Sequence, residues 1–151
     1  DVYQHQIRGS EIIEGRFENA DVFGELTSCE AIIFASPTYM GGAAAQFKAF
    51  ADATSDFWGS QIWSTKFAAG ITSGSAFNGD QSNTLHYFSI LASQHGMLWV
   101  GLDTITNKNS LNRFGCQLGV VAHSDDGEVN ESDLNTARYL GARLSELILK
   151  A

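Results

Sequence analysis

The sequence is poor in residues that would point to several other classes of protein. It has one proline, Pro37, and two cysteines, Cys29 and Cys116, among 151 residues. The cysteines lack the spacing of a metal site or a redox motif, so we expect reduced thiols rather than a disulfide. Lys and Arg number nine against 17 Asp and Glu. These basic residues are scattered, which argues against a nucleic-acid partner.

Long apolar runs and export signals are also missing. No stretch approaches the roughly 18 apolar residues of a membrane span, and the first residues do not resemble a signal peptide. The histidines lack metal-ligand spacing and the acidic loop at 123–128 lacks the carboxylates of a calcium loop, so we expect no metal. With 44% hydrophobic and 17% charged residues, we expect one globular domain over 1–151, cytoplasmic and without a membrane partner.

Strand-like and helix-like segments alternate along the chain. Apolar runs predict strands at 31–36, 67–72, 97–102 and 117–122, with a shorter candidate at 2–7. Helical spacing predicts helices at 20–28, 43–56, 80–94 and 132–149, with Ser132 as the last N-cap and Gly96 just beyond the third helix. This alternation is typical of a parallel, doubly wound α/β sheet.

Two strand ends carry the most informative segments. Residues 31–42 form an apolar run that ends at Pro37 and a glycine-rich turn, and residues 67–75 form a second run with a small, hydroxyl-rich end. If the strands are parallel neighbours, both loops lie at the edge where open α/β sheets bind ligands. They offer NH groups and hydroxyls but no nucleophile with its base, which favours cofactor binding over hydrolysis. Plain chain reversal remains an alternative for each loop.

Five segments occur in a specific order and spacing: 32–41, 46–50 with Trp58 beyond it, 72–75, 94–97 and 137–141. From about Ala31 to the C-terminus the chain thereby resembles the flavodoxin-like NAD(P)H:quinone oxidoreductases of the WrbA (tryptophan-repressor-binding protein) type. The resemblance implies a three-layer α/β/α, doubly wound parallel sheet. It also implies FMN as cofactor, NAD(P)H as co-substrate, a quinone or similar small aromatic acceptor, and a homodimer or homotetramer.

The resemblance also implies which residues form the site. His95 would contact the cofactor near its reactive face and act in catalysis, and Trp58 would wall a neighbouring subunit's substrate pocket. From the sequence alone, a helix-end histidine and an ordinary core tryptophan remain alternatives. The flavin would lie between two loops, whose residues are Pro37, Thr38, Tyr39, Met40 and Gly41 in the first and Ser73, Gly74, Ser75, Ala76, Phe77 and Asn78 in the second.

One part of that family has no match in this sequence. Flavodoxin-like chains open with a central strand and a hydroxyl-rich loop at a helix N-terminus that holds the FMN phosphate. Residues 1–34 contain no such loop, and the carboxylates of Glu11 and Glu14 would repel a phosphate. We therefore expect the first central strand to be missing. Either the sequence omits an N-terminal segment, or another chain supplies the strand, or the protein is a relative that no longer binds FMN.

The expected function is FMN-dependent two-electron reduction of quinones by NAD(P)H. Two alternatives remain. A flavodoxin-like electron carrier without its own substrate would suit the acidic surface, whose formal net charge is −8. A flavin-free structural or interaction protein would suit the missing phosphate loop.

Overall fold

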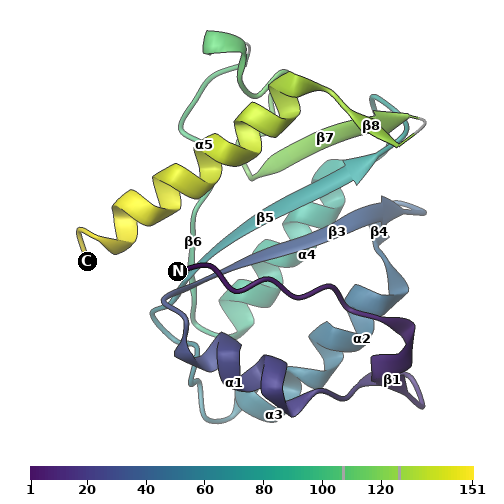
Figure 1. Cartoon of the computed structure of the whole chain (residues 1–151), viewed down its shortest axis with the longest axis vertical. Helices are drawn as coiled ribbons and strands as arrows, with labels where there is room; N and C mark the ends of the chain where they lie inside the picture. Colours follow the sequence, from purple (N-terminus) through teal and green to yellow (C-terminus); the bar gives the residue numbers. More distant parts are fainter. Residues whose placement is uncertain (107, 126) are drawn as a thin grey trace.

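The computed structural model describes residues 1–106, 108–125 and 127–151 and shows a parallel sheet with helices on both faces (Figure 1). Its central strands are β3 (Ala31–Tyr39), β5 (Phe67–Gly74) and β7 (Val120–Asp125). β5 pairs in parallel with β3 on one side and with β7 on the other, and β6 (Leu98–Trp99) pairs in parallel with the start of β5. The four predicted strands therefore lie in one sheet and are parallel where they pair, which confirms the predicted architecture.

The helices form the outer two of three layers. α2 (Ala45–Ala53) and α4 (Gln81–Gln94) cover one face, where Phe47 and Phe88 lie 4.6 Å apart between ring centroids and pack with Phe34 of β3. α5 (Glu131–Ile148) covers the other face, where Leu140 packs with Val120 of β7. α1 (Ala20–Ser28) matches the predicted bounds, whereas the helix expected at 43–56 is divided into α2 and α3 (Ser55–Trp58).

Several short elements have no counterpart in the sequence prediction, because two- or three-residue elements are too short to show a periodicity. β4 (Gly42–Ala43) pairs antiparallel with β3, and β8 (Glu128–Val129) pairs antiparallel with β7. β1 (Ile12–Ile13) and β2 (Arg16–Phe17) form a separate hairpin. The remaining short elements are the 3-10 helices η1 (Gly9–Glu11) and η2 (Lys108–Ser110).

Several predicted element ends differ from the structure. The strand expected at 117–122 is β7, which begins at Val120 and continues to Asp125. The N-cap of α5 is Asn130 rather than Ser132, because the Asn130 side chain accepts the Ser132 NH at 2.9 Å. The strand expected at 97–102 is shortened to β6, since the following chain turns toward the segment before β7 and the Leu102 NH bonds to the Gln117 carbonyl at 2.8 Å. Gly96 follows α4 with a φ of +68°, as predicted for a glycine beyond a helix end.

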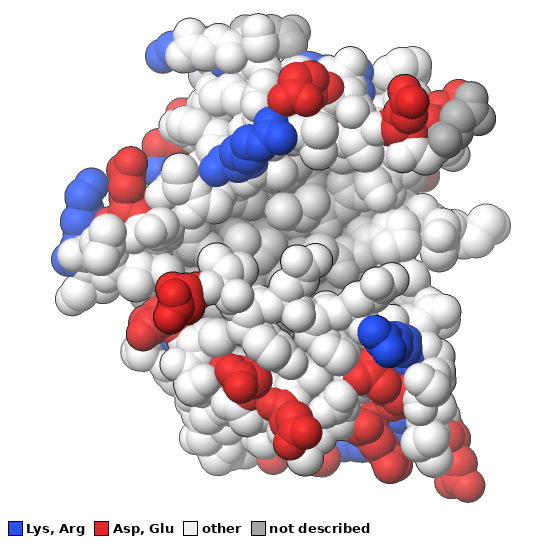
Figure 2. Space-filling model, in the orientation of Figure 1, with Lys and Arg blue, Asp and Glu red and all other residues white. Residues whose placement is uncertain are grey.

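β3 has an open edge on the side away from β5. Among the described residues, only β4 pairs with that edge, at Thr38 and Tyr39. The strand expected at 2–7 is not formed, since no strand of the described ranges lies beside this segment to share hydrogen bonds with it. Ile33 of β3 is 41% exposed. Figure 2 shows that the middle of the face in view is hollowed and free of charged side chains.

Candidate functional site

The two predicted ligand loops lie side by side at the carboxyl edge of the sheet. The parallel register of β3 and β5 pairs Pro37 with Ser73, the two positions at which the loops begin. Asn83 of α4 donates to the Gly41 carbonyl at 2.7 Å, so the helix that follows the second loop is bonded to the first. The structure therefore brings Pro37–Gly41 and Ser73–Asn78 together at the carboxyl edge of the sheet.

A line of threonine hydroxyls fixes the spacing between the loops. The Thr38 hydroxyl lies 2.8 Å from both the Thr72 and the Thr84 hydroxyls, and Thr72 donates to the Ser36 carbonyl at 2.8 Å. Since a hydroxyl has one proton, Thr72 accepts from Thr38, and Thr38 accepts from Thr84. The result is a directed chain from α4 through β3 to β5, which orients the Thr38 side chain.

The first loop presents side chains at a tight turn. Met40 and Gly41 have φ values of +50° and +78°, the conformation of a two-residue hairpin turn between β3 and β4. A left-handed backbone is costly for a residue other than glycine, so Met40 is held there by the hairpin. Tyr39 and Met40 are both exposed, and their side chains are available to a ligand.

The side chain of Gln81, the first residue of α4, is hydrogen-bonded to the backbone of the second loop. Its buried side chain accepts the Gly79 NH at 2.9 Å and donates to the Ala76 carbonyl. A Cβ at Gly74 would come within 2.7 Å of the Gln81 amide nitrogen, so a larger residue there would displace this support. The loop leaves Phe77 68% exposed at its tip.

β7 adds an aromatic partner that the sequence analysis did not identify. The His123 ring stacks on Phe77 with centroids 4.3 Å apart and an interplanar angle of 7°. His123 Nε2 lies 3.0 Å from the Ser75 carbonyl, which can only accept, so this nitrogen carries a proton. The sequence did place His123 directly after the strand predicted at 117–122, at the sheet edge where ligands bind.

An ion pair between half-buried Arg113 and buried Asp133 lies next to this histidine. Arg113 donates two hydrogen bonds of 2.7 Å to Asp133, which also accepts the His123 NH at 3.0 Å. The hydrogen bonds to buried Asp133 raise the pKa of Arg113. The Arg113 guanidinium lies 4.3 Å above the Phe114 ring, and Phe114 lies 6.1 Å from Phe77. This network joins α5, β7 and the second loop.

The structure does not bring His95 to the two loops. His95 follows α4, whose 14 residues span about 21 Å from the second loop. It is 2% exposed, packs on Trp63 and bonds through Nε2 to the Thr54 hydroxyl at 2.8 Å. Because Thr54 donates to the Ala51 carbonyl, Nε2 must be the donor. Burial lowers the pKa of His95. Its predicted catalytic contact with the cofactor remains a prediction.

Trp58 also lies away from the loops of its own chain. Gln61 donates to the carbonyls of Trp58 and Gln94, which places α3 beside the end of α4. Trp58 is 55% exposed, and its chain neighbour Phe57 lines an apolar groove. Its predicted contact with a neighbouring subunit remains a prediction. The groove is lined by Ala20, Phe23, Gly24, Thr27, Phe57 and Ile62.

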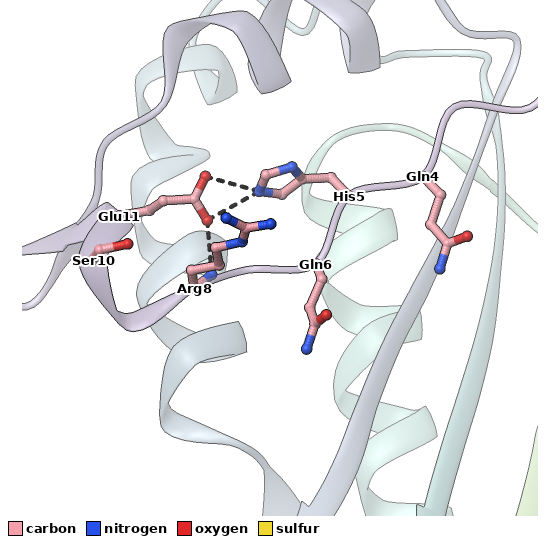
Figure 3. A pocket seen from close by; sticks show the side chains of 6 residues that line it. All are labelled: Gln4, His5, Gln6, Arg8, Ser10 and Glu11. Carbon is pink, nitrogen blue, oxygen red and sulfur yellow. Dashed lines mark hydrogen bonds and ion pairs between the residues drawn. The ribbon is translucent and has the colours of Figure 1, made fainter.

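A polar hollow near the N-terminus is organised around Glu11 (Figure 3). The Glu11 carboxylate accepts the Arg8 NH at 2.7 Å, the Asn19 amide at 2.7 Å and the His5 ring at 2.9 Å. These donors, led by the Arg8 backbone, lower the pKa of Glu11 to about 2. The carboxylate therefore stays ionised and ties residues 5–8 to α1.

The parallel sheet with helices on both faces, and the two loops paired at its carboxyl edge, define the class as a flavodoxin-like α/β protein. No described helix is long and apolar enough to cross a membrane. Within the described ranges, no three His, Cys, Asp or Glu side chains are grouped so as to hold a metal.

Comparisons with known proteins identify the family. The family described as "NADPH-dependent FMN reductase" matches residues 18–110. Flavodoxin FldP of Pseudomonas aeruginosa is 34% identical over 132 residues, which cover 81% of this chain and 72% of that protein. The NAD(P)H dehydrogenase (quinone) of Archaeoglobus fulgidus is 34% identical over 126 residues, covering 83% of this chain and 63% of that protein. The chain therefore belongs to the NADPH-dependent FMN reductase family.

A solved structure supports the same assignment. The flavodoxin, WrbA-like protein from Agrobacterium tumefaciens superposes with a TM-score of 0.75 and 39% identity, over 93% of this chain and 78% of that one. The chain is thus a flavodoxin-like oxidoreductase of the WrbA type, a class that uses FMN and NAD(P)H. It spans less than two thirds of the length of the quinone dehydrogenase from Archaeoglobus fulgidus.

The described residues fit the ring end of FMN. A flat isoalloxazine needs apolar or aromatic contact on its faces and hydrogen-bonding groups along one edge. Apolar or aromatic contact is available from the exposed side chains of Tyr39, Met40 and Phe77. Hydrogen-bonding groups are available from the hydroxyls of Ser73 and Ser75 and from the NH groups of the loops.

Proposed function

We propose that the chain takes part in FMN-dependent two-electron reduction of quinones by NAD(P)H. The observation that carries this proposal is the pairing of Pro37–Gly41 with Ser73–Asn78 at one sheet edge, fixed by the parallel register of β3 and β5. Relatives that match this chain are NAD(P)H dehydrogenases of quinones. We assign the cofactor ring to the edge of the sheet at which these two loops meet.

In this proposal the protein's contribution is binding and orientation. When bound, FMN supplies the redox chemistry, accepting hydride equivalents from NAD(P)H and passing two electrons to the acceptor. The threonine chain keeps the two loops at a fixed separation, so the binding groups are preorganised before the ligand arrives. The exposed side chains of Tyr39, Met40 and Phe77 would exclude water from the ring faces.

The test begins with flavin content and continues with turnover. Purified protein should show visible flavin absorbance or take up FMN with saturable fluorescence quenching, and quinone should then accelerate NAD(P)H oxidation. Thr38→Val removes one hydroxyl of the chain and leaves its neighbours unpaired, so we expect a roughly 5- to 30-fold weaker FMN affinity. Ser93→Ala, on the exposed surface of α4, is the control. Protein that neither contains nor binds FMN would refute the proposal.

An electron carrier without its own substrate is the second candidate. The match to a flavodoxin of Pseudomonas aeruginosa and the net charge of −8 favour it. A carrier would bind FMN and accept electrons from a separate reductase, yet a mixture of NAD(P)H and quinone alone would give no turnover. Protein that binds no flavin at all would instead favour the flavin-free interpretation.

A further inference from the structure

We infer that Phe77 and His123 together form a stacking surface for a planar ring at the reactive edge, either the flavin or the quinone acceptor. This inference rests on the proposed function and adds His123 to it as a positioning residue. Phe77 comes from the loop after β5 and His123 from β7, so two strands of the sheet contribute to one surface.

The geometry of the pair supports a ligand role for the outer face of Phe77. The two rings are nearly parallel, with centroids 4.3 Å apart, so His123 covers one face of Phe77. Phe77 nevertheless remains 68% exposed, so most of its surface is open to solvent although the Phe114 ring lies 6.1 Å away. A flat aromatic face that is supported from behind and open in front is suited to stacking with a planar ring.

His123 is itself held in place, so the surface is rigid. Its Nε2 proton is directed at the Ser75 carbonyl, 3.0 Å away, and its backbone NH is bonded to buried Asp133. Asp133 also holds Arg113, which lies over the Phe114 ring beside Phe77. A preorganised partner loses little freedom on binding, so more of the stacking interaction contributes to affinity.

The experiment separates the ring of His123 from its hydrogen bond. His123→Phe keeps a stacking ring and loses the donor to Ser75, whereas His123→Gln keeps an amide donor and loses the ring. The effect of an aromatic pair corresponds to about 2- to 12-fold in affinity. We therefore expect His123→Phe to stay within about 2-fold of the wild type and His123→Gln to lose about 3- to 10-fold. His86→Gln, on the exposed surface of α4, is the matched control.

Two measurements identify which ring is bound. FMN affinity from fluorescence quenching reports the flavin, and the KM for menadione with kcat unchanged reports the acceptor. The imidazole NMR resonances of His123 provide a readout that does not depend on turnover. They should move by ring-current shifts on addition of FMN or of menadione to the FMN-loaded protein, while those of His86 stay in place.

The outcomes are distinct for the inference and for the function on which it rests. If FMN binds but neither ligand moves the His123 resonances, the stacking surface is refuted while the flavin assignment stands. Equal losses in the Phe and Gln variants would show that the hydrogen bond or the loop fold matters rather than the ring, and would also overturn the inference. Absence of both FMN binding and any menadione response would overturn the inference together with the proposed function.

Discussion

At the scale of single residues, buried His95 is expected to make stability depend on pH. Its pKa is lowered in the folded protein, so the unfolded chain binds the proton more readily as pH falls below about 6.5. The wild type should therefore lose stability between about pH 7.5 and pH 5. His95→Gln should be less stable by about 1–3 kcal/mol at the higher pH, with a smaller difference at the lower one. Urea unfolding at both pH values measures this, and a constant difference would contradict it.

Glu11 is expected to stabilise the protein at neutral pH and to lose this effect in acid. Because its pKa falls to about 2 in the folded protein, its stabilising effect is fully present above its ordinary pKa of 4.5 and is lost as pH falls toward 2. Glu11→Gln should lower the thermal midpoint at neutral pH and match the wild type near pH 2. Exposed Glu14 in the neighbouring turn provides the control, Glu14→Gln. An unchanged midpoint at neutral pH would refute the prediction.

At the scale of elements, the Arg113–Asp133 pair is expected to hold the start of α5 against the loop before β7. Arg113→Leu leaves the carboxylate of Asp133 buried without its cation, which should cost about 3–5 kcal/mol of unfolding free energy. Arg138→Leu breaks the exposed pair with Glu131 in the same helix and should cost less than about 1 kcal/mol. Similar losses in the two variants, measured by denaturant unfolding, would show that burial of the pair is unimportant.

The long elements could be predicted from the sequence because their residues carry the information locally. The apolar runs at 31–36 and 67–72 and the helical spacing at 20–28 reappear as β3, β5 and α1. Residues 2–7 have a strand-like sequence too, but a strand also requires a neighbour, and pairing is not encoded in the segment itself. The two-residue strands lie below the length at which a period can be recognised.

The site could be predicted in part. The loops after β3 and β5 follow from the rule that ligands bind at the carboxyl edge of a parallel sheet, and the register places them together. His123 and Phe77 are 46 positions apart, so their stacking depends on the fold rather than on local sequence. The packing of His95 on Trp63 is a long-range contact of the same kind.

At the scale of the whole molecule, we expect self-association through the region of Trp58. Its exposed ring and the groove beside Phe57 lie far from the loops of the same chain, so a ligand could meet Trp58 only across a subunit contact. Light scattering at micromolar concentration should show a dimer or tetramer. Trp58→Ser should weaken assembly by at least about 10-fold. Leu149→Ser, which removes an even more exposed apolar side chain near the C-terminus, should have no effect. A wild-type monomer at this concentration would contradict the prediction.

The open edge of β3 has a consequence for amide hydrogen exchange. In a parallel strand, successive NH groups point to opposite neighbours. Over Ala31–Pro37 the described residues provide a paired neighbour on the β5 side alone. Deuterium uptake along this segment should therefore alternate between slow and fast positions, residue by residue. A chain or ligand that pairs with this edge would slow exchange at the fast positions. Exchange rates that alternate along β3, measured by NMR, would therefore show whether the edge of the sheet is occupied in solution.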